Sequence, residues 1–393
     1  MIAKSICPID GSCFSLCWVR ELFTRKSNED AVPAQYRRNV RIPSLLAIFL
    51  VMGQAFAQTP YPTIERIDPA LDAIVSVNAK LDLVGEHFGT TEGPVWVQQE
   101  SSAFLLFSDI PANVIYKWSP DDGLSVFLEK SGFTGVDSSN VGAQSMAGRL
   151  TTIVLGSNGL ALDPQGRVVM ATHGDRNIVR LERDGTRTVL ADRYEGKRFS
   201  GPNDLVVKSN GALFFTDTQF GLRGGDKSPA KELPFYAVYL VKDGKVTAVD
   251  RDPQGGAPNG IALSPDEKSL YVGSAGKIIQ YEIQSDDTLR SGRVVIEAST
   301  DGMKVDQYGN FYLTSGRRKE GYWFGGAVTI VSPQGKRLGM INLPEVLGVG
   351  ATSVAFGDED RKTLYITARG RVYRIRLNVA GGPVTSVSPT TKR

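Results

Sequence analysis

Six polar side chains recur at the same position of six related segments of this sequence. They are Glu92, Asn158, Asn203, Asn259, Asp301 and Ser353. Two are carboxylates and three are amides, so a fold that gathered the segment starts would surround one point with oxygen atoms. Oxygen sites of this kind favour Ca²⁺, Mg²⁺ or Mn²⁺, whereas zinc sites usually contain imidazole or thiolate. A polar channel lined by hydrogen-bonded side chains and water is the alternative interpretation.

The six residues each open a short β-rich segment, such as NGLALDPQGRVVMATHG at Asn158 and NGIALSPDEKSLYVGS at Asn259. An alternating apolar strand leads through an Asp, Asn or Gly turn into a second strand rich in Val, Phe and Tyr, which is typical of β-structure. The segments begin at intervals of roughly 40 to 65 residues, which suits four-stranded propeller blades with insertions. We therefore predict an all-β, six-bladed β-propeller with four-stranded blades around a central site. The Gly- and Ser-rich stretch 131–156 is predicted to be a surface loop.

Four of these positions carry motifs that resemble those of a known family: EGPVW at Glu92, PND at Asn203, PNG at Asn259 and DGMKVD at Asp301. They are similar to the metal-site motifs of the gluconolactonase, regucalcin and luciferin-regenerating enzyme family. The run LADRYEGKRFSGPNDLVV (190–207) resembles the bacterial gluconolactonase branch. The resemblance implies one divalent metal ion, with calcium favoured over magnesium, manganese or zinc. It implies Glu92, Asn259 and Asp301 as direct ligands, and Asn203 as a ligand directly or through water.

The resemblance also implies a metal-dependent lactonase that converts glucono-1,5-lactone to gluconate, a small-molecule substrate. The metal would polarise the carbonyl, and Asp301 would act as general base toward water. A metal-bound water of lowered pKa is an equivalent description. Hydrolysis of other lactones or of phosphotriesters, and a non-enzymatic calcium-binding propeller scaffold, are the alternative functions. A serine hydrolase is disfavoured because the sequence has no G-x-S-x-G motif.

Three residues are predicted to contact the substrate: Asn158, His173 and Asn203. For Asn158 the alternative role is to support the residues that touch the metal or the substrate. His173 ends the second strand of its segment, and a structural hydrogen bond is its alternative role. Asp109 and Asp217 lie at corresponding strand ends, where Asp more often closes a turn. The aromatic run 322–324 is expected either to stack on sugar or to cover an apolar edge between blades.

The apolar run IPSLLAIFLVMGQAFA (42–57) follows three arginines and ends in Ala55-Phe56-Ala57, which is typical of a secretory signal cleaved after Ala57. The run is shorter than the roughly 20 residues of a membrane-spanning helix. We therefore predict export to the periplasm and no integral membrane span in the mature form. A mis-assigned start, with initiation at Val40, would explain why residues 1–39 precede the signal. The three cysteines, Cys7, Cys13 and Cys17, all lie in this leader.

The whole chain has 393 residues and a formal net charge of +3, and this near-balance makes nucleic acid an improbable partner. Four regions are predicted: a leader (1–57), a lead-in segment (58–90), the propeller (91–378) and a C-terminal tail (379–393). The sequence carries no signature of oligomeric state.

Overall fold

The computed structural model describes residues 63–146 and 149–382. They belong to the compact unit Thr59–Arg393. The predicted signal (42–57), the proposed start at Val40 and the three cysteines therefore lie outside the described residues, as does most of the predicted tail. Within the described part of the chain, no helix is long and apolar enough to cross a membrane.

Three sheets of four antiparallel strands follow one another along the chain, each with its strands in sequence order. The first contains β8 (Ser157–Leu162), β9 (Val168–Thr172), β10 (Asn177–Leu181) and β11 (Arg187–Ala191). The second contains β14 (Pro202–Val207), β15 (Leu213–Asp217), β16 (Ala237–Lys242) and β17 (Lys245–Arg251). The third contains β18 (Pro258–Leu263), β19 (Ser269–Ser274), β20 (Lys277–Glu282) and β21 (Arg293–Ile296).

A fourth sheet has the same up-and-down order with one strand added at its outer edge. It contains β22 (Met303–Val305), β23 (Phe311–Lys319), β24 (Tyr322–Val331), β25 (Arg337–Leu347) and β1 (Ile64–Arg66). β1 comes from the N-terminal side of the chain and pairs antiparallel with β25. The N-terminal segment thus contributes an edge strand to a sheet formed more than 230 residues later.

The remaining large sheet joins the two ends of the described chain. Its six strands lie in the order β26, β27, β2, β3, β4, β5. They are β26 (Ser353–Gly357), β27 (Thr363–Arg376), β2 (Leu81–Gln98), β3 (Ala103–Asp109), β4 (Val114–Ser119) and β5 (Gly123–Glu129). β2 pairs with β27 through residues 81–91 and with β3 through residues 91–98, so it changes partner near Thr91. Residues 81–90, predicted as part of the lead-in segment, therefore belong to a sheet.

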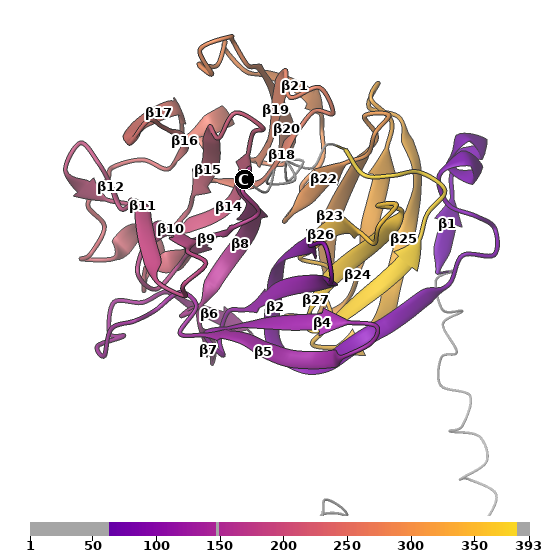
Figure 1. Ribbon diagram of the computed structural model, residues 1–393, viewed down its shortest axis with the longest axis horizontal. Helices are drawn as coiled ribbons and strands as arrows, with labels where there is room; N and C mark the ends of the chain where they lie inside the picture. The colour runs from indigo at the N-terminus through magenta and orange to yellow at the C-terminus, as the bar shows by residue number, and fades with distance from the viewer. Residues whose placement is uncertain (1–62, 147–148, 383–393) are drawn as a thin grey trace, which may run out of the picture. The chain divides into compact units, whose positions relative to one another are not determined.

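The first strands of the sheets lie side by side in cyclic order. β2 contacts β8, β8 contacts β14, β14 contacts β18, β18 contacts β22 and β22 contacts β26, and β26 returns to β2. In Figure 1 the sheets follow one another around a centre, with β8, β14, β18 and β22 toward the inside. This radial packing confirms the predicted all-β propeller with four-stranded blades.

The remaining elements are short insertions between or within blades. The predicted loop 131–156 contains a hairpin of β6 (Ala143–Met146) and β7 (Arg149–Ile153). A second small hairpin pairs β12 (Arg193–Tyr194) with β13 (Lys197–Arg198). Four 3₁₀ turns occur in the described residues: η1 (Pro69–Ala73), η2 (Gln219–Gly221), η3 (Gly225–Lys227) and η4 (Pro253–Gly255).

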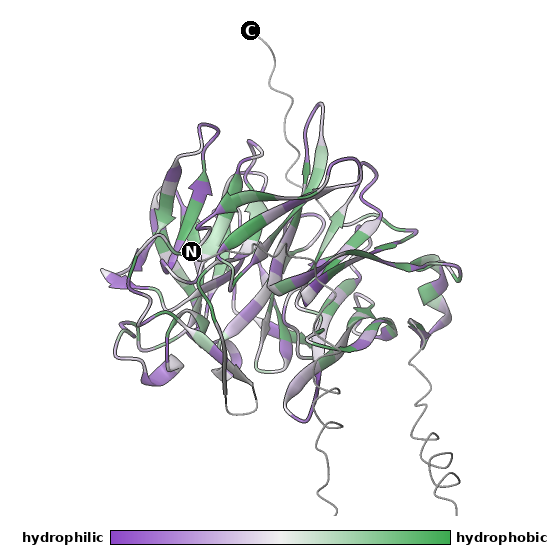
Figure 2. Cartoon of the chain, turned by 90° about the horizontal axis from the view of Figure 1, so that it is seen from below, coloured by the Kyte–Doolittle hydropathy of each residue, from purple (hydrophilic) through white to green (hydrophobic). Residues whose placement is uncertain are grey.

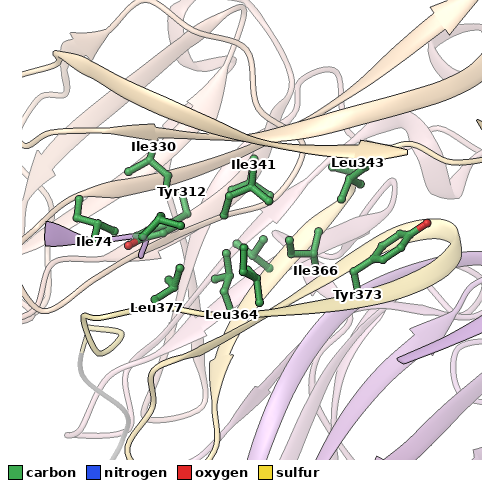
Figure 3. Packing of buried hydrophobic residues seen from close by; sticks show 14 of the residues in the cluster. Ile74, Tyr312, Ile330, Ile341, Leu343, Leu364, Ile366, Tyr373 and Leu377 are labelled. Carbon is green, nitrogen blue, oxygen red and sulfur yellow. The ribbon is translucent and has the colours of Figure 1, made fainter. Parts of the chain in front are cut away.

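The apolar core is divided among the interfaces between neighbouring sheets. Its largest cluster lies between the sheet of β22–β25 and strands β26 and β27, where Tyr312, Ile341 and Ile366 are buried (Figure 3). Leu71 of η1 belongs to the same cluster, so the N-terminal segment is held by apolar packing as well as by β1. Burial of each such side chain contributes about 1.5–3 kcal/mol. Figure 2 shows hydrophobic colour along the strands and hydrophilic colour at many of the connecting turns.

Candidate functional site

The six recurrent polar residues all lie where a first strand begins. Asn158, Asn203 and Asn259 are each the second residue of their strands, β8, β14 and β18. Ser353 is the first residue of β26, Asp301 comes two residues before β22, and Glu92 lies in β2 directly after the change of partner at Thr91. Since these strands are neighbours in the ring, the structure gathers the six positions at one end of the propeller centre.

Close backbone approaches explain why glycine follows several of these residues. A Cβ on Gly93 would lie 2.0 Å from the carbonyl oxygen of Asn158 in the next blade. A Cβ on Gly159 would lie 2.8 Å from the carbonyl oxygen of Asn203, and one on Gly260 would lie 2.4 Å from that of Asp301. Only glycine permits this contact between successive strands. The residue pairs Glu-Gly, Asn-Gly and Asp-Gly are therefore both site and packing motifs.

Hydroxyl groups on neighbouring strands complete the ring of contacts. Ser108 Oγ donates to the carbonyl oxygen of Asn158 at 3.0 Å, and Thr216 Oγ1 donates to that of Asn259 at 2.8 Å. Thr352 Oγ1 donates to the carbonyl oxygen of Thr91 at 2.8 Å, which links β26 to β2. These bonds fix the backbone on which the candidate side chains stand.

The two acidic residues of the set interact with each other through their charges. Glu92 is only 8% exposed, and its burial together with the negative charge of Asp301 raises its pKa well above the usual range. Burial raises the pKa of Asp301 to about 6, although the positive charge of Arg369 and a hydrogen bond lower it. That bond comes from Asn259, whose Nδ2 donates to Asp301 Oδ1 at 3.0 Å. The structure thus brings Glu92, Asn259 and Asp301 into one electrostatic group.

Sequence reasoning missed two charged members of this group, Asp204 and Arg369. The charge of Asp204 raises the pKa of both Glu92 and Asp301, while that of Arg369 lowers both. Asp204 accepts a hydrogen bond from the backbone N–H of Leu205 at 2.9 Å. It accepts a second one, at 3.2 Å, from the backbone N–H of Ile261 in the next blade. The PND motif carries Asp where four of the other five recurrent residues are followed by Gly, and this exception was the available signal. Arg369 follows closely after the last residue of β27 that pairs with β26. His173 likewise follows the last residue of β9 that pairs with β8.

The four ionisable side chains of this group do not balance one another. Glu92, Asp204 and Asp301 are acidic and Arg369 is basic, so full ionisation leaves two negative charges uncompensated. Among the described residues, no three or more His, Cys, Asp or Glu side chains gather closely enough to hold a metal ion. A metal site here would therefore depend on amide oxygens as well as the two carboxylates.

The predicted substrate residues are buried beside the acidic group. Asn203 is buried, and Asn158 Nδ2 lies 3.4 Å from His173 Nε2. Burial lowers the pKa of His173 to about 4, so its imidazole is neutral at pH 7. Its Nδ1 is buried with no hydrogen-bond partner among the described residues. His173 thus combines the predicted structural bond with one unused polar atom.

Asp109 and Asp217 hold backbone segments next to the site. Asp109 accepts hydrogen bonds from the N–H groups of Gly89 and Thr90. Asp217 accepts from the N–H of Ser200 at 3.0 Å and from that of Gly201, two residues before Asn203, at 2.6 Å. Burial raises the pKa of Asp217 to about 7 despite these bonds. Both aspartates therefore brace the blade, as expected for residues at these strand ends.

A separate cavity of about 330 Å³ lies between the sheet of β8–β11 and that of β14–β17. Its lining includes Asp163 and Gly211, which lie in turns that follow the first strands of these blades, away from the ends that carry the candidate residues. Most of the charges that line it are paired, as in the contact of Arg167 with Asp163 at 2.7 Å. This cavity is therefore distinct from the candidate site.

Comparison with known proteins assigns the chain to a family. Residues 90–370 match the profile of the SMP-30/Gluconolactonase/LRE-like region. The chain belongs to this family. The predicted resemblance is thereby confirmed, and the matched range includes all of the motifs on which it was based.

Individual relatives agree with this assignment. A gluconolactonase from Zymomonas mobilis is 33% identical over 335 residues, which cover 81% of this chain and 87% of the relative. The structure of a gluconolactonase from Xanthomonas campestris is 29% identical, with a TM-score of 0.63 and coverage of 80% and 94%. The structure of regucalcin from Agrobacterium tumefaciens, a calcium-binding protein, is 17% identical with a TM-score of 0.57 and coverage of 78% and 97%. At that identity the last likeness concerns the fold alone.

Proposed function

We propose that this protein hydrolyses sugar lactones, with glucono-1,5-lactone as the reference substrate and gluconate as its product. Two relatives with 29% and 33% identity are named gluconolactonases, and each aligns over about four fifths of this chain. The observation that carries the proposal in the structure itself is the buried group of Glu92, Asn259 and Asp301 at the starts of three first strands. Hydrolysis of other lactones or phosphotriesters would use the same group.

We further propose six blades, with the six-stranded sheet counted as two blades. This count is supported by β2, which pairs with β27 in its first half and with β3 in its second. It is also supported by β27, which pairs with β26 through residues 363–367 and with β2 through residues 369–375. The N-terminal part of β2 would then be the outer strand of the last blade and close the ring.

The proposed cofactor is one divalent cation held by Glu92, Asn203, Asn259 and Asp301. The residues fit such an ion because the buried group lacks two positive charges, and carboxylate and amide oxygens are the ligands that calcium prefers. Asn259 uses its Nδ2 to bind Asp301, so its Oδ1 remains to face a cation. When bound, the ion would polarise the lactone carbonyl and stabilise negative charge on its oxygen.

The chain's own residues have separate roles in this proposal. Asp301 accepts a proton from the attacking water, and the hydrogen bond from Asn259 to its Oδ1 orients the carboxylate so that Oδ2 takes the proton. Asn158, Asn203 and neutral His173 contact the sugar hydroxyls. The unused Nδ1 of His173 supplies a donor in this arrangement.

Export to the periplasm, with cleavage after Ala57, remains part of the proposal. It rests on the sequence of residues 42–57 and their arginine-containing flank.

Hydrolysis of glucono-1,5-lactone by the purified protein, followed by pH-stat after subtraction of the uncatalysed rate, tests this function. Activity should disappear with EDTA and return with calcium, magnesium or manganese. Asp301→Asn should lower kcat by about 10²–10⁴-fold, the usual contribution of a general base. Asp121→Asn, at an exposed turn, is the matched control and should retain full activity.

Two results would contradict the proposal. Unchanged activity of Asp301→Asn would remove the assigned base. Calcium binding without hydrolysis of any lactone or phosphotriester, under every metal tested, would favour the non-enzymatic scaffold instead.

A further inference from the structure

Arg369 lies at an unusual point of the backbone, beside the candidate site. It is a non-glycine residue with φ +53°, in the part of β27 where pairing passes from β26 to β2. Its carbonyl oxygen accepts a hydrogen bond from Thr91 Oγ1 at 2.7 Å, and Thr91 directly precedes Glu92. The strand that carries Arg369 is thus tied to the strand that carries Glu92.

The guanidinium of Arg369 is held mainly by stacking. Its Cζ lies 3.9 Å from the centre of the Trp323 ring, a close cation–π contact. Nη1 makes one long hydrogen bond, 3.4 Å, to Gln144 Oε1, and Nε is buried without a hydrogen-bond partner among the described residues. A guanidinium has five N–H donors. Stacking therefore fixes the position of this group while leaving donors unused.

Trp323 is built into the structure as the platform for this arginine. A Cβ on Gly316 would lie 2.3 Å from the indole, and one on Gly350 would lie 3.2 Å from it and 3.6 Å from Arg369. The two glycines thus make room for the ring and its cation. Because Arg369 covers the indole, Trp323 acts as a support for the arginine rather than as an open sugar-stacking surface.

A second arginine shares the same ring and strengthens the positive potential there. Arg318 Cζ lies 4.3 Å from the centre of the Trp323 ring. Burial lowers the pKa of Arg369, and the charge of Arg318 lowers it further. Neither Arg318 nor Arg369 forms a salt bridge with a carboxylate in the described part of the chain. The two arginines thus share the Trp323 ring and have no carboxylate partner among the described residues.

We propose that Arg369, supported by Trp323 and Arg318, binds the carboxylate of the aldonate product. The two oxygens of that carboxylate are the lactone carbonyl oxygen and the oxygen of the attacking water, while the ring oxygen leaves as a hydroxyl group. This role rests on the proposed lactonase function and adds a residue to it. The placement suits the task, since the charge of Arg369 acts on both Glu92 and Asp301, where the reacting carbonyl would lie. Paired N–H donors match the two oxygens of a carboxylate, which form only on ring opening. Arg369 is therefore a substrate- and product-binding residue, and the substrates it favours are lactones that open to acids.

Calorimetric titration of the calcium-loaded protein with sodium gluconate tests this assignment without turnover. Arg369→Gln should weaken gluconate binding by about tenfold or more, the usual loss for a hydrogen-bonded charge pair. Arg369→Lys should recover only part of the affinity, because a lysine lacks the planar pair of donors. Arg374→Gln is the matched control. Arg374 also lies in β27, and its Cζ is 5.2 Å from the centre of the Trp118 ring, so its loss should leave gluconate binding unchanged.

The kinetics should separate binding from support of the fold. Arg369→Gln should raise KM and the inhibition constant of gluconate, while calcium affinity and melting temperature stay near those of the wild type. Equal gluconate affinity in wild type and Arg369→Gln would overturn the inference. Loss of calcium binding in Arg369→Gln would also overturn it, because Arg369 would then be a structural counter-ion. Absence of hydrolysis by the wild type would instead refute the proposed function, a result that gluconate titration keeps separate.

Discussion

His173 should make the stability of the fold depend on pH in a way that one substitution removes. Its side chain is 1% exposed, and burial lowers its pKa from 6.5 to about 4. In the unfolded chain the imidazole regains its ordinary pKa and takes up a proton more readily. The stabilisation that the neutral imidazole gives the folded state is complete above pH 6.5, the unfolded pKa. It is lost as the pH falls toward 4, because the unfolded chain then binds a proton that the folded protein does not.

The size of the effect follows from the two pKa values. A difference of about 2.5 pKa units corresponds to about 3 kcal/mol in full. Linkage places about 2 kcal/mol of that loss between pH 7 and pH 5, and most of the rest by pH 4. Glu92, Asp301 and Asp217 have raised pKa values, so they act in the opposite direction. Wild type alone therefore cannot reveal the histidine, and a comparison with a variant is required.

Urea unfolding of wild type and His173→Gln at pH 7, 6 and 5 isolates the contribution. The free-energy difference between the two proteins should shift by about 2 kcal/mol in favour of the variant from pH 7 to pH 5. The chain has two histidines, and the side chain of His87 is 88% exposed, so His87→Gln is the control and should follow the wild-type profile. Parallel profiles for wild type and His173→Gln would refute the account of a buried neutral imidazole.

Three further predictions concern the same end of the propeller. Gly93→Ala should destabilise the fold by about 3 kcal/mol or more in thermal unfolding, because φ is +50° and the new Cβ would meet a backbone oxygen. Gly123→Ala is the control: φ is +70° but the space around it is open, so the substitution should cost only about 1 kcal/mol. Asp217→Ala should leave two buried N–H groups without acceptors, lower stability by roughly 1–3 kcal/mol and reduce lactone hydrolysis. Calcium affinity, followed by calorimetry, should fall at least tenfold per pH unit below pH 6, since Asp301 and Glu92 must both release a proton to bind.

Local sequence patterns were sufficient to predict the blades and the starts of their first strands. Alternating apolar residues between Asp, Asn and Gly turns define each strand pair, and the recurrent residues fix their phase. Asn158, Asn203 and Asn259 lie at the second position of their strands, as this phase implies. The repeated chemistry of the strand starts therefore predicted the propeller fold and the gathering of the six recurrent positions, whereas their roles toward metal and substrate stay predictions.

Non-local pairing and single-residue exceptions could not be predicted in the same way. The segment 81–90 pairs with residues near the C-terminal end of the described chain, and no local signal records a partner so far away. The charge of Arg369 acts on Glu92 and Asp301 only because β27, near the C-terminal end, pairs with β2, the strand that contains Glu92. The hairpin within 131–156 was hidden by its Gly- and Ser-rich composition.

The most direct test of the central claim is a crystal structure of the protein grown with calcium, with the ion located by its anomalous signal. One peak is expected within about 2.3–2.6 Å of side-chain oxygens of Glu92, Asn203, Asn259 and Asp301, the distances typical of calcium. No peak at that point, or a calcium ion held by other residues, would contradict the claim that four separate strands of this propeller converge on a single cation.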